Sequence, residues 1–226
     1  MSLYIQITSK CNMTCDHCGF ACTARGKDMT RETFDKAIAL AVAQDITLTI
    51  GGGEPTLHPH CKDFVLHAQW ELATLSNSLG GAAVSIITNG SNTSISLTLA
   101  HLAEVGTIHA VVSRDQWHDP IDPRVFAAFT KKGKAFYNKI HESDHDNREI
   151  RSVTNIIPVG RAKGWSERKK GDCVCNSVFI TPLGKVYPCG CRKTCLGTLD
   201  TVELKYWHFQ GFCESSKDYK EEMANA

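Results

Sequence analysis

The sequence predicts an α/β fold in which helices cover a parallel sheet. Strand-like and helix-like segments alternate along the chain up to Gly160, which is typical of this class. In addition, four chemically distinctive motifs each follow a predicted strand. Because the carboxyl ends of parallel strands meet at one edge of a sheet, we expect these four motifs to share one site.

The first elements are predicted from periodicity and capping. Residues 3–8 form a strand that runs into a group of cysteines. Thr30 is a helix cap, and one apolar face follows it at the spacing i, i+4, i+8, made of Phe34, Ile38 and Val42. The next elements are a strand at 46–50, a helix with the stripe Phe64, Ala68, Leu72 and Leu75, a strand at 83–87, a helix at 97–105 and a strand at 108–113.

The remaining elements divide the chain into two predicted domains. Asp122 and Pro123 begin a helix, as N-cap and first helical residue. A polar loop at 143–149 and a fifth strand at 153–158 follow it, and a linker occupies 160–171. Residues 178–181 and 186–188 form a hairpin around a Pro-Leu-Gly turn. We therefore predict a core domain at 1–163 and a small cysteine-rich cap at 164–226.

Composition and charge exclude some partners. The net charge of +1 provides no overall field that would attract nucleic acid or an anionic membrane. No segment approaches 18 consecutive apolar residues, and the N-terminus lacks the pattern of a signal peptide. We therefore expect a cytoplasmic protein without a membrane or nucleic-acid partner.

The 11 cysteines are unusual in their distribution. Four lie within residues 11–22 and six within residues 173–213, and only Cys61 lies between these groups. An odd total in tight groups argues against a disulfide framework of the secreted type. Two separated groups of thiols in a reducing compartment predict two metal or iron–sulfur sites.

The first group has the spacing Cys11-x3-Cys15-x2-Cys18, which places three thiolates in one short loop. Three ligands to a four-iron cluster leave one iron open for chemistry, whereas a pure electron carrier normally closes that position. Cys22 is an alternative fourth ligand, which leaves an electron carrier as a second interpretation.

The triad, together with residues 51–59 (GGGEPTLHP), resembles the radical S-adenosylmethionine (SAM) superfamily. This resemblance implies that Cys11, Cys15 and Cys18 hold a [4Fe–4S] cluster whose open iron binds SAM. It also implies that the glycine-rich motif binds the amino group of the SAM methionine, through Gly52, Gly53 and Glu54.

The resemblance implies further contacts with SAM. Thr88 and Asn89 match the ending of the family's third strand, close to the cofactor. Ser113 and Asp115 resemble the polar pair after the fourth strand that contacts the ribose or carboxylate, although Arg114 between them departs from the usual apolar residue. Residues 156–162 (IIPVGRA) are similar to the segment that closes over the adenine, where Arg161 is a candidate partner for a carboxylate.

The activity and the shape of the core also follow from the resemblance. Such an enzyme reductively cleaves SAM to a 5′-deoxyadenosyl radical, which abstracts hydrogen from a peptide or from a nucleoside-type or sugar-type substrate. The reductant is expected to be of the flavodoxin or ferredoxin type. The core is short for the family, so we expect a partial, laterally open (β/α) barrel of five or six parallel strands. His118 is a candidate acid or base, with an ordinary loop histidine as the alternative.

The C-terminal cysteines are similar to the SPASM and Twitch extensions, which carry auxiliary [4Fe–4S] clusters. The resemblance rests on the hairpin between Cys173 and Cys189. The preferred ligands of one auxiliary cluster are Cys173, Cys189, Cys191 and Cys213, with Cys175 and Cys195 as substitutes. Cysteine pairs around a hairpin also build zinc ribbons. A two-cluster electron-transfer protein and a zinc-ribbon binding module therefore remain as alternative functions.

Overall fold

The computed structural model describes residues 2–74, 82–130, 146–153, 156, 159–163 and 177–204. Within these residues one eight-stranded sheet has the order β5-β4-β3-β2-β1-β6-β7-β8. The strands are β1 (Ser2–Thr8), β2 (Thr47–Gly52), β3 (Val84–Thr88), β4 (His109–Ser113), β5 (Arg148–Arg151), β6 (Ser177–Ile180), β7 (Lys185–Tyr187) and β8 (Gly197–Thr198).

The six strands from β5 to β6 in this order run parallel, and only β7 and β8 are antiparallel additions. The edge strands β5 and β8 pair with no further strand in the described residues, so this sheet does not close. These observations confirm the predicted α/β class and the partial, open (β/α) barrel.

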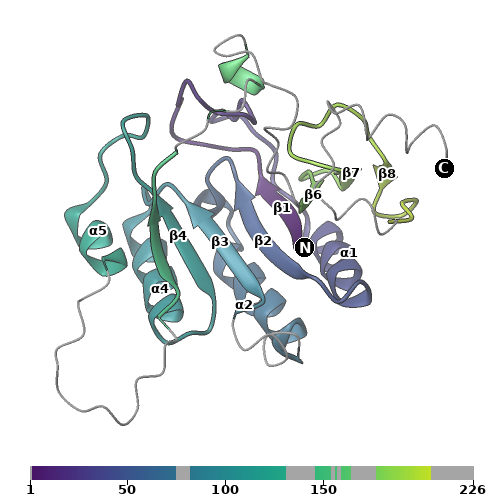
Figure 1. The fold of residues 1–226 in the computed structure, drawn as a ribbon, viewed down its shortest axis with the longest axis horizontal. Coiled ribbons are helices and arrows are strands. Elements are labelled where there is room, and N and C mark those ends of the chain that lie inside the picture. Colours follow the sequence, from purple (N-terminus) through teal and green to yellow (C-terminus); the bar gives the residue numbers. More distant parts are fainter. Residues whose placement is uncertain are drawn as a thin grey trace.

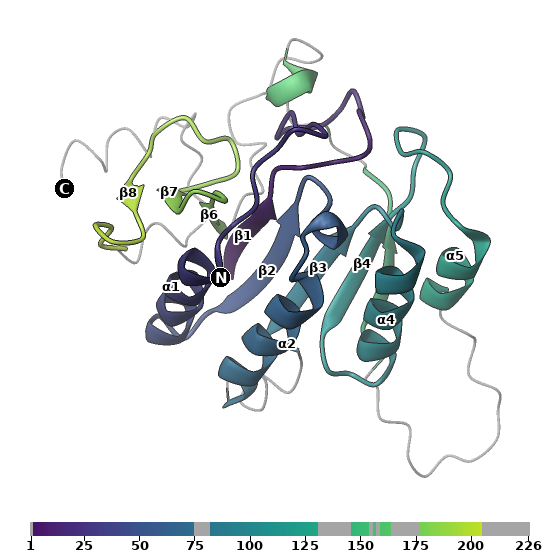
Figure 2. The same ribbon diagram turned by 180° about the vertical axis from the view of Figure 1, so that it is seen from behind.

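Helices cover one face of the sheet, and none of the described helices covers the other (Figures 1 and 2). The covering helices are α1 (Arg31–Ala43), α2 (Cys61–Glu71) and α4 (Thr93–Glu104), with α5 (Pro123–Phe129) beyond them near β4. The short helices η1 (Pro55–Leu57) and η2 (Gly160–Ala162) lie in connecting segments. In the described part of the chain, every helix is too short or too polar to span a lipid bilayer.

Capping decides where these helices begin. The side chain of Thr30 accepts a hydrogen bond from Thr33 N, and that of Asp122 accepts one from Arg124 N, so both predicted caps are confirmed. Helix α4 begins four residues before the predicted position, because Asn92 accepts from Ile95 N and caps it there.

The hydrophobic core lies between the sheet and the helices. Alternate residues of strands β1 to β4 and β6 point into it, as the pleat of a strand requires, and these include Leu3, Ile5 and Ile7 of β1. They pack against the apolar faces of the helices, where Phe34 of α1 and Phe64 of α2 stack with their centroids 4.0 Å apart. The intervening strand residues point to the helix-free face.

The prediction for the fifth strand was wrong. Strand β5 lies at Arg148–Arg151, partly inside the predicted polar loop, and the described residues 153 and 156 are not in a strand. Residues 154, 155, 157 and 158 lie outside the described residues. The charged β5 is tolerated because it forms an edge of the sheet, where Arg148 pairs with Asp146 and Glu104.

The C-terminal hairpin confirms the predicted turn and extends the same sheet. Strands β6 and β7 flank the turn, and β6 pairs in parallel with β1. The division into domains at residues 163 and 164 stays a prediction, since β6 and β1 belong to one sheet.

Candidate functional site

A long loop that contains the first four cysteines lies over the carboxyl ends of the strands (Figure 1). We call residues 9–28 the cysteine loop. Its two ends are held together by backbone hydrogen bonds, with Ser9 N to Lys27 O at 2.8 Å and Met29 N to Ile7 O at 2.8 Å. The loop is therefore closed at its base, although its ends are separated by 18 residues of chain.

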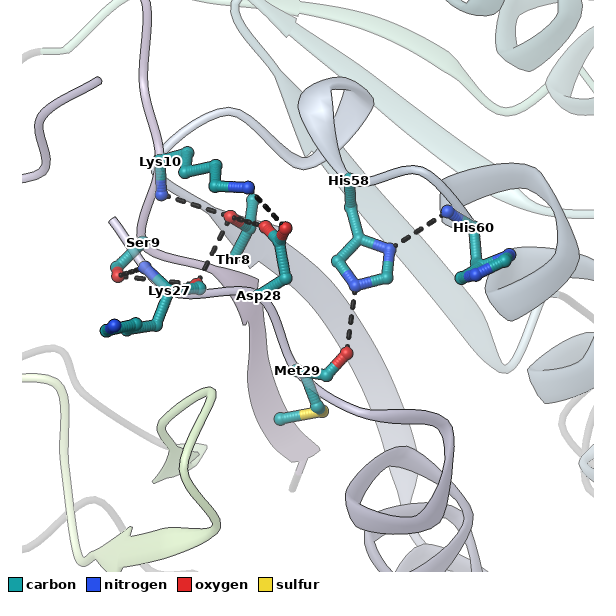
Figure 3. Close-up of polar contacts among 8 residues, drawn as sticks. All are labelled: Thr8, Ser9, Lys10, Lys27, Asp28, Met29, His58 and His60. Carbon is teal, nitrogen blue, oxygen red and sulfur yellow. Dashed lines mark hydrogen bonds and ion pairs between the residues drawn. The ribbon is translucent and has the colours of Figure 1, made fainter. Parts of the chain in front are cut away.

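Polar side chains reinforce this base (Figure 3). The Asp28 carboxylate accepts a hydrogen bond from Thr8 Oγ1 at 2.7 Å and forms an ion pair with the Lys10 ammonium. Partial burial opposes the charge, but the hydrogen bonds from Lys10 and Thr8 hold the pKa of Asp28 below its usual range. The carboxylate therefore stays ionised and keeps both partners near neutral pH.

His58 connects the base of the cysteine loop to the glycine-rich segment (Figure 3). Its Nε2 lies 2.9 Å from Met29 O, and its Nδ1 accepts from His60 N at 3.1 Å. This pairing requires the tautomer with hydrogen on Nε2. Burial lowers the pKa of His58, which favours this neutral form. His58 thus has a structural role in fastening the loop.

The cysteine thiols of this loop gather in one packed group. Cys11 and Cys22 are buried together with Met13, and Cys15 and Cys18 pack against them. A hydrogen bond from the Cys22 thiol, followed by backbone N–H groups of Cys22 and Phe20, lowers the pKa of Cys18 to about 5. Burial raises the pKa values of Cys11 and Cys15.

Cys22 differs from the other three thiols in its partners. Its pKa is raised, first by the hydrogen bond with Cys18 and then by burial, so it stays a thiol. The side-chain amide of Gln6 on β1 donates to Cys22 Sγ at 3.3 Å. Cys22 therefore lies next to the triad as a neutral hydrogen-bonding neighbour.

The glycine loop, residues 51–55, runs directly against the start of the cysteine loop. Gly53 N donates to Thr8 O at 2.8 Å, and Glu54 N donates to Lys10 O at 2.7 Å. A Cβ atom on Gly53 would lie 2.2 Å from Lys10 O and 2.9 Å from Cys11 Cβ. Glycine is required here because the two loops approach too closely for any side chain.

Glu54 is fully buried beneath these loops. Its Oε1 accepts from Thr56 N, Thr56 Oγ1 and Thr88 Oγ1 at 2.6–3.0 Å, and its Oε2 accepts from Asn89 N at 2.6 Å. Burial raises the pKa of this carboxyl group, although the four donors oppose the shift. Glu54 therefore joins the glycine loop to the end of β3.

The end of β3 also binds the cysteine loop. Asn89 Nδ2 donates to Asn12 Oδ1 at 3.2 Å, and Ser91 Oγ donates to the same oxygen at 3.1 Å. Asn12 lies between Cys11 and Cys15 in sequence. The predicted site residues Thr88 and Asn89 therefore lie near the triad. Thr88 is linked to it by its hydrogen bond to Glu54, and Asn89 by its hydrogen bond to Asn12.

The segment after β4 carries the predicted Ser113, Asp115 and His118. Ser113 ends β4 beside Arg151 of β5. The carboxylate of Asp115 is held within the protein, accepting from Trp117 N at 2.9 Å and Val153 N at 3.0 Å and lying 2.8 Å from His118 Nδ1. A contact between Asp115 and SAM stays a prediction.

Arg161 contacts backbone carbonyls of the cysteine loop. Its Nε donates to Cys15 O at 2.8 Å, its Nη1 to Cys22 O at 2.7 Å, and its backbone N to Cys18 O at 3.0 Å. The preceding Gly160 has φ of +62°, and a Cβ there would lie 2.5 Å or less from the carbonyl oxygens of Cys18 and Gly19. Helix η2 is therefore a clamp across the cysteine loop.

Three of the predicted auxiliary-cluster cysteines lie in the described residues. Cys189 is buried, Cys191 is partly buried and Cys195 is exposed. Arg192 in this segment donates to Gly19 O at 3.3 Å, and its guanidinium lies 5.3 Å from the ring centroid of Phe20. The segment after β7 therefore touches the cysteine loop. Cys173, Cys175 and Cys213 lie outside the described residues.

The residues present fit the iron–sulfur cluster that the sequence predicts. Three thiol side chains lie in one packed group, and one of them is already favoured as a thiolate, the form that binds iron. Sequence reasoning did not identify the residues that fasten the loop. These are Gln6, Lys10, Asn12, Asp28 and Arg192, and none lies in a pattern that reveals its partner.

Comparisons with known proteins agree with this site. The Radical SAM superfamily model matches residues 5–169. BtrN in complex with AdoMet and 2-DOIA has a TM-score of 0.57 and 16% identity, over 88% of this chain and 78% of that one.

Two further solved structures share the fold. SuiB from Streptococcus suis bound to precursor peptide SuiA has a TM-score of 0.54 and 14% identity, over 92% of this chain and 64% of that one. Histidine-tagged anSMEcpe with bound AdoMet has a TM-score of 0.52 and 15% identity, over 98% and 82%. No curated protein matches the sequence. Because the family model covers well over half of the chain and includes both the cysteine loop and the glycine loop, the chain belongs to the radical SAM superfamily.

Proposed function

We propose that this radical SAM enzyme holds its [4Fe–4S] cluster on Cys11, Cys15 and Cys18 and binds SAM against the glycine loop. The proposal is supported above all by one observation, the direct backbone pairing of the glycine loop with the start of the cysteine loop. This pairing holds the two motifs at a fixed distance. When bound, the cluster and SAM supply the radical chemistry that removes a hydrogen atom from the substrate.

The contacts of Glu54 refine which atoms meet SAM. Its carboxylate already accepts four hydrogen bonds and is 0% exposed. We therefore assign the acceptors for the SAM amino group to the backbone carbonyls of Gly52 and Gly53. In this assignment Glu54 is a positioning residue that fixes those carbonyls.

We propose a peptide as the substrate. SuiB, which has the same fold, is described with a bound precursor peptide. Among the described residues, the open sheet has one face without helices, which suits an extended chain better than an enclosed pocket does. A small molecule is the second candidate, because BtrN is described with AdoMet and 2-DOIA.

A row of connected polar side chains on the helix-free face favours the peptide. Ser85 Oγ lies 3.2 Å from His109 Nδ1, and His109 Nε2 lies 3.1 Å from Glu149 Oε2. Arg151 completes the row by a two-point ion pair with Glu149, at 2.9 and 3.1 Å. These four residues come from β3, β4 and β5. They offer donors, acceptors and both charges to a peptide.

Replacing Arg151 with glutamine is expected to raise KM for the peptide about tenfold. The reason is the loss of one charge-assisted hydrogen bond to the peptide, which contributes about 1.4 kcal/mol. Cleavage of SAM without peptide is expected to stay unchanged, since Arg151 lies in β5 and contacts neither the cysteine loop nor the glycine loop through any described hydrogen bond. Steady-state kinetics with the peptide varied would measure this. Arg31→Gln, on the helix-covered face, is the control. Equal KM values in both variants would exclude this face as the peptide site.

We further propose an auxiliary [4Fe–4S] cluster in the C-terminal segment, with Cys189 and Cys191 among its ligands and Cys173 and Cys213 as the predicted others. Flavodoxin or ferredoxin is the proposed source of electrons. The core is proposed as residues 1–163 and the cap as 164–226. The hydrogen bond from Arg192 to Gly19 O supports a cap that lies against the cysteine loop of the core.

The proposed function is tested by anaerobic reconstitution followed by dithionite and SAM. We expect 5′-deoxyadenosine and methionine as products, with about eight irons per chain if both clusters form and about four if only the first does. A protein that binds about four or more irons and forms no 5′-deoxyadenosine would contradict the proposal. Zinc in place of iron would favour the zinc-ribbon alternative.

Replacing Cys22 with alanine separates the enzyme from the electron-carrier alternative. We expect the variant to keep its first cluster and its SAM-dependent change in the electron paramagnetic resonance (EPR) spectrum, because Cys22 is a neutral neighbour of Cys18. Cys18→Ala is the matched comparison and should lose both. Loss of the cluster in Cys22→Ala, to the same extent as in Cys18→Ala, would identify Cys22 as the fourth ligand.

A further inference from the structure

Three aromatic rings join the cysteine loop to the sheet. Phe20 comes from the cysteine loop, Tyr4 from β1 and Phe179 from β6. Tyr4 and Phe179 are direct partners in the parallel pairing of their strands, and their rings stack with centroids 5.3 Å apart. The centroid of Phe20 lies 5.7 Å from that of Tyr4 and 5.0 Å from that of Phe179. The three rings therefore form one surface, which we call the aromatic platform.

Arg192 of the C-terminal segment covers this platform. Its guanidinium carbon lies 5.3 Å from the ring centroid of Phe20 and 5.6 Å from that of Phe179. Its Nη2 donates to Gly19 O at 3.3 Å, and the residue is partly buried. A guanidinium over aromatic rings is attracted by their faces, more strongly where water is displaced. These contacts hold a permanent positive charge against the two residues that follow Cys18.

The backbone of Arg192 provides an independent observation. Its φ is +55°, in the left-handed region where glycine fits without strain and a residue with a side chain does not. The turn is closed by Arg192 N, which donates to Cys189 O at 3.2 Å. Strained residues of this kind persist where the surrounding structure holds them, and they are concentrated at functional sites. An arginine at a position that suits glycine indicates that its side chain is used.

The charge of Arg192 acts on the thiols of the cysteine loop. The hydrogen bond with Cys18 and burial raise the pKa of Cys22, and the charge of Arg192 opposes that rise. Cys22 packs in the same group as the three predicted cluster ligands. Reduction adds one negative charge to an iron–sulfur cluster, so a cation held nearby in a partly dry environment favours the reduced form.

We propose that Arg192 raises the reduction potential of the first cluster, so that a residue of the predicted cap sets how readily this cluster accepts an electron. The inference rests on the proposed function, because it takes Cys11, Cys15 and Cys18 as the ligands. It deepens that function by giving the C-terminal segment a role that does not depend on an auxiliary cluster. Among its described contacts, Arg192 meets the cysteine loop at a backbone carbonyl and an aromatic ring, and it acts on the cluster through its charge.

Arg192→Gln is expected to lower the ratio of reduced to oxidised first cluster about tenfold at a fixed solution potential, which corresponds to about 59 mV for one electron. A unit charge acting over about 10 Å at an effective dielectric constant of about 20 changes an equilibrium by roughly this factor. The measurement is a dithionite titration of the full chain, reconstituted anaerobically, with redox mediators and EPR detection. SAM is left out, and the signal of the first cluster is identified by its loss in Cys18→Ala.

Two further variants separate the charge of Arg192 from its packing. Arg192→Lys keeps the charge and is expected to stay close to the original potential. Arg192→Gly removes the charge and relieves the backbone strain, so it should shift the potential as Arg192→Gln does, and it provides the measurement if Arg192→Gln does not fold.

Arg25→Gln is the matched control. Arg25 also belongs to the cysteine loop, but it is exposed, so water and salt screen its charge. This control is expected to keep the original potential. Thermal melting and iron content would confirm that each variant is folded and carries its cluster.

Two results would overturn the proposal. One is an unchanged potential in folded, iron-loaded Arg192→Gln or Arg192→Gly. The other is a shift in Arg192→Lys as large as that in Arg192→Gln, which would assign the effect to lost packing. An original protein that forms no first cluster would refute the proposed function itself, and this inference with it, so the two failures are distinguishable.

Discussion

Replacement of Arg161 with alanine is expected to make the first cluster about 10- to 100-fold easier to remove, the usual effect of losing an outer-shell partner of a metal site. Arg161 holds three carbonyls of the cysteine loop, those of Cys15, Cys18 and Cys22, the first and last through its guanidinium. Hydrogen bonds that involve a charged group contribute about 1.5–3 kcal/mol each. Without the guanidinium, the cysteine loop loses the two hydrogen bonds that hold the carbonyls of Cys15 and Cys22 together.

The measurement is the rate of iron loss to a chelator under anaerobic conditions, together with iron and sulfide content. Arg161→Lys keeps the charge but lacks the fork that spans two carbonyls, so we expect an intermediate loss. Arg31→Ala, on the exposed face of α1, controls for removal of an arginine. If Arg161→Ala retained its cluster as long as Arg31→Ala does, the clamp would have no role in holding it.

Replacement of Gly53 with alanine is expected to give the second large effect, a loss of about 3 kcal/mol in the free energy of unfolding, the upper part of the range for overpacking. The added Cβ would lie 2.2 Å from the backbone oxygen of Lys10, which is itself held by Glu54 N. Backbone cannot turn away as a side chain can, so the two loops must separate. The melting temperature should fall by roughly 6–12 °C for a chain of this size.

Gly190→Ala is the matched control for Gly53→Ala. A Cβ at Gly190 would meet only the ring of Phe20, at an ordinary contact distance of 3.6 Å. Thermal melting followed by circular dichroism would compare the two variants, and the SAM-dependent change in the EPR spectrum would report the first cluster. If both variants melted at the same temperature, the close approach of the two loops would not be a determinant of stability.

Much of the fold was predictable from local pattern. The caps Thr30 and Asp122 and the strands at β1 to β4 each have a signal within a few residues, and the structure confirms them. Strand β5 lacks such a signal. Its four residues are mostly charged, and they form a strand only because β4 offers an unpaired edge. The pairing partner decides the structure of such a segment, and the sequence does not reveal it.

The candidate site divides in the same way. The cysteine spacing and the glycine-rich motif point to the radical SAM family by themselves, because the three predicted cluster ligands lie within eight residues and the second motif follows the next strand. The partners of Asp115 were not predictable. Its carboxylate accepts hydrogen bonds from Trp117 N and Val153 N and lies beside His118, and its contact with SAM stays a prediction.

The sequence alone therefore determined the family, the order of strands and helices from β1 to α5 and the motifs that meet at the carboxyl edge of the sheet. Tertiary structure alone decided that Arg161 clamps a loop about 140 residues earlier and that His17 meets His118 across about 100 residues. The physical reason is that residues a few positions apart in one loop must lie close in space, because the chain itself limits the distance between their side chains. Contacts between loops depend on which strand ends become neighbours, and no local pattern carries that information.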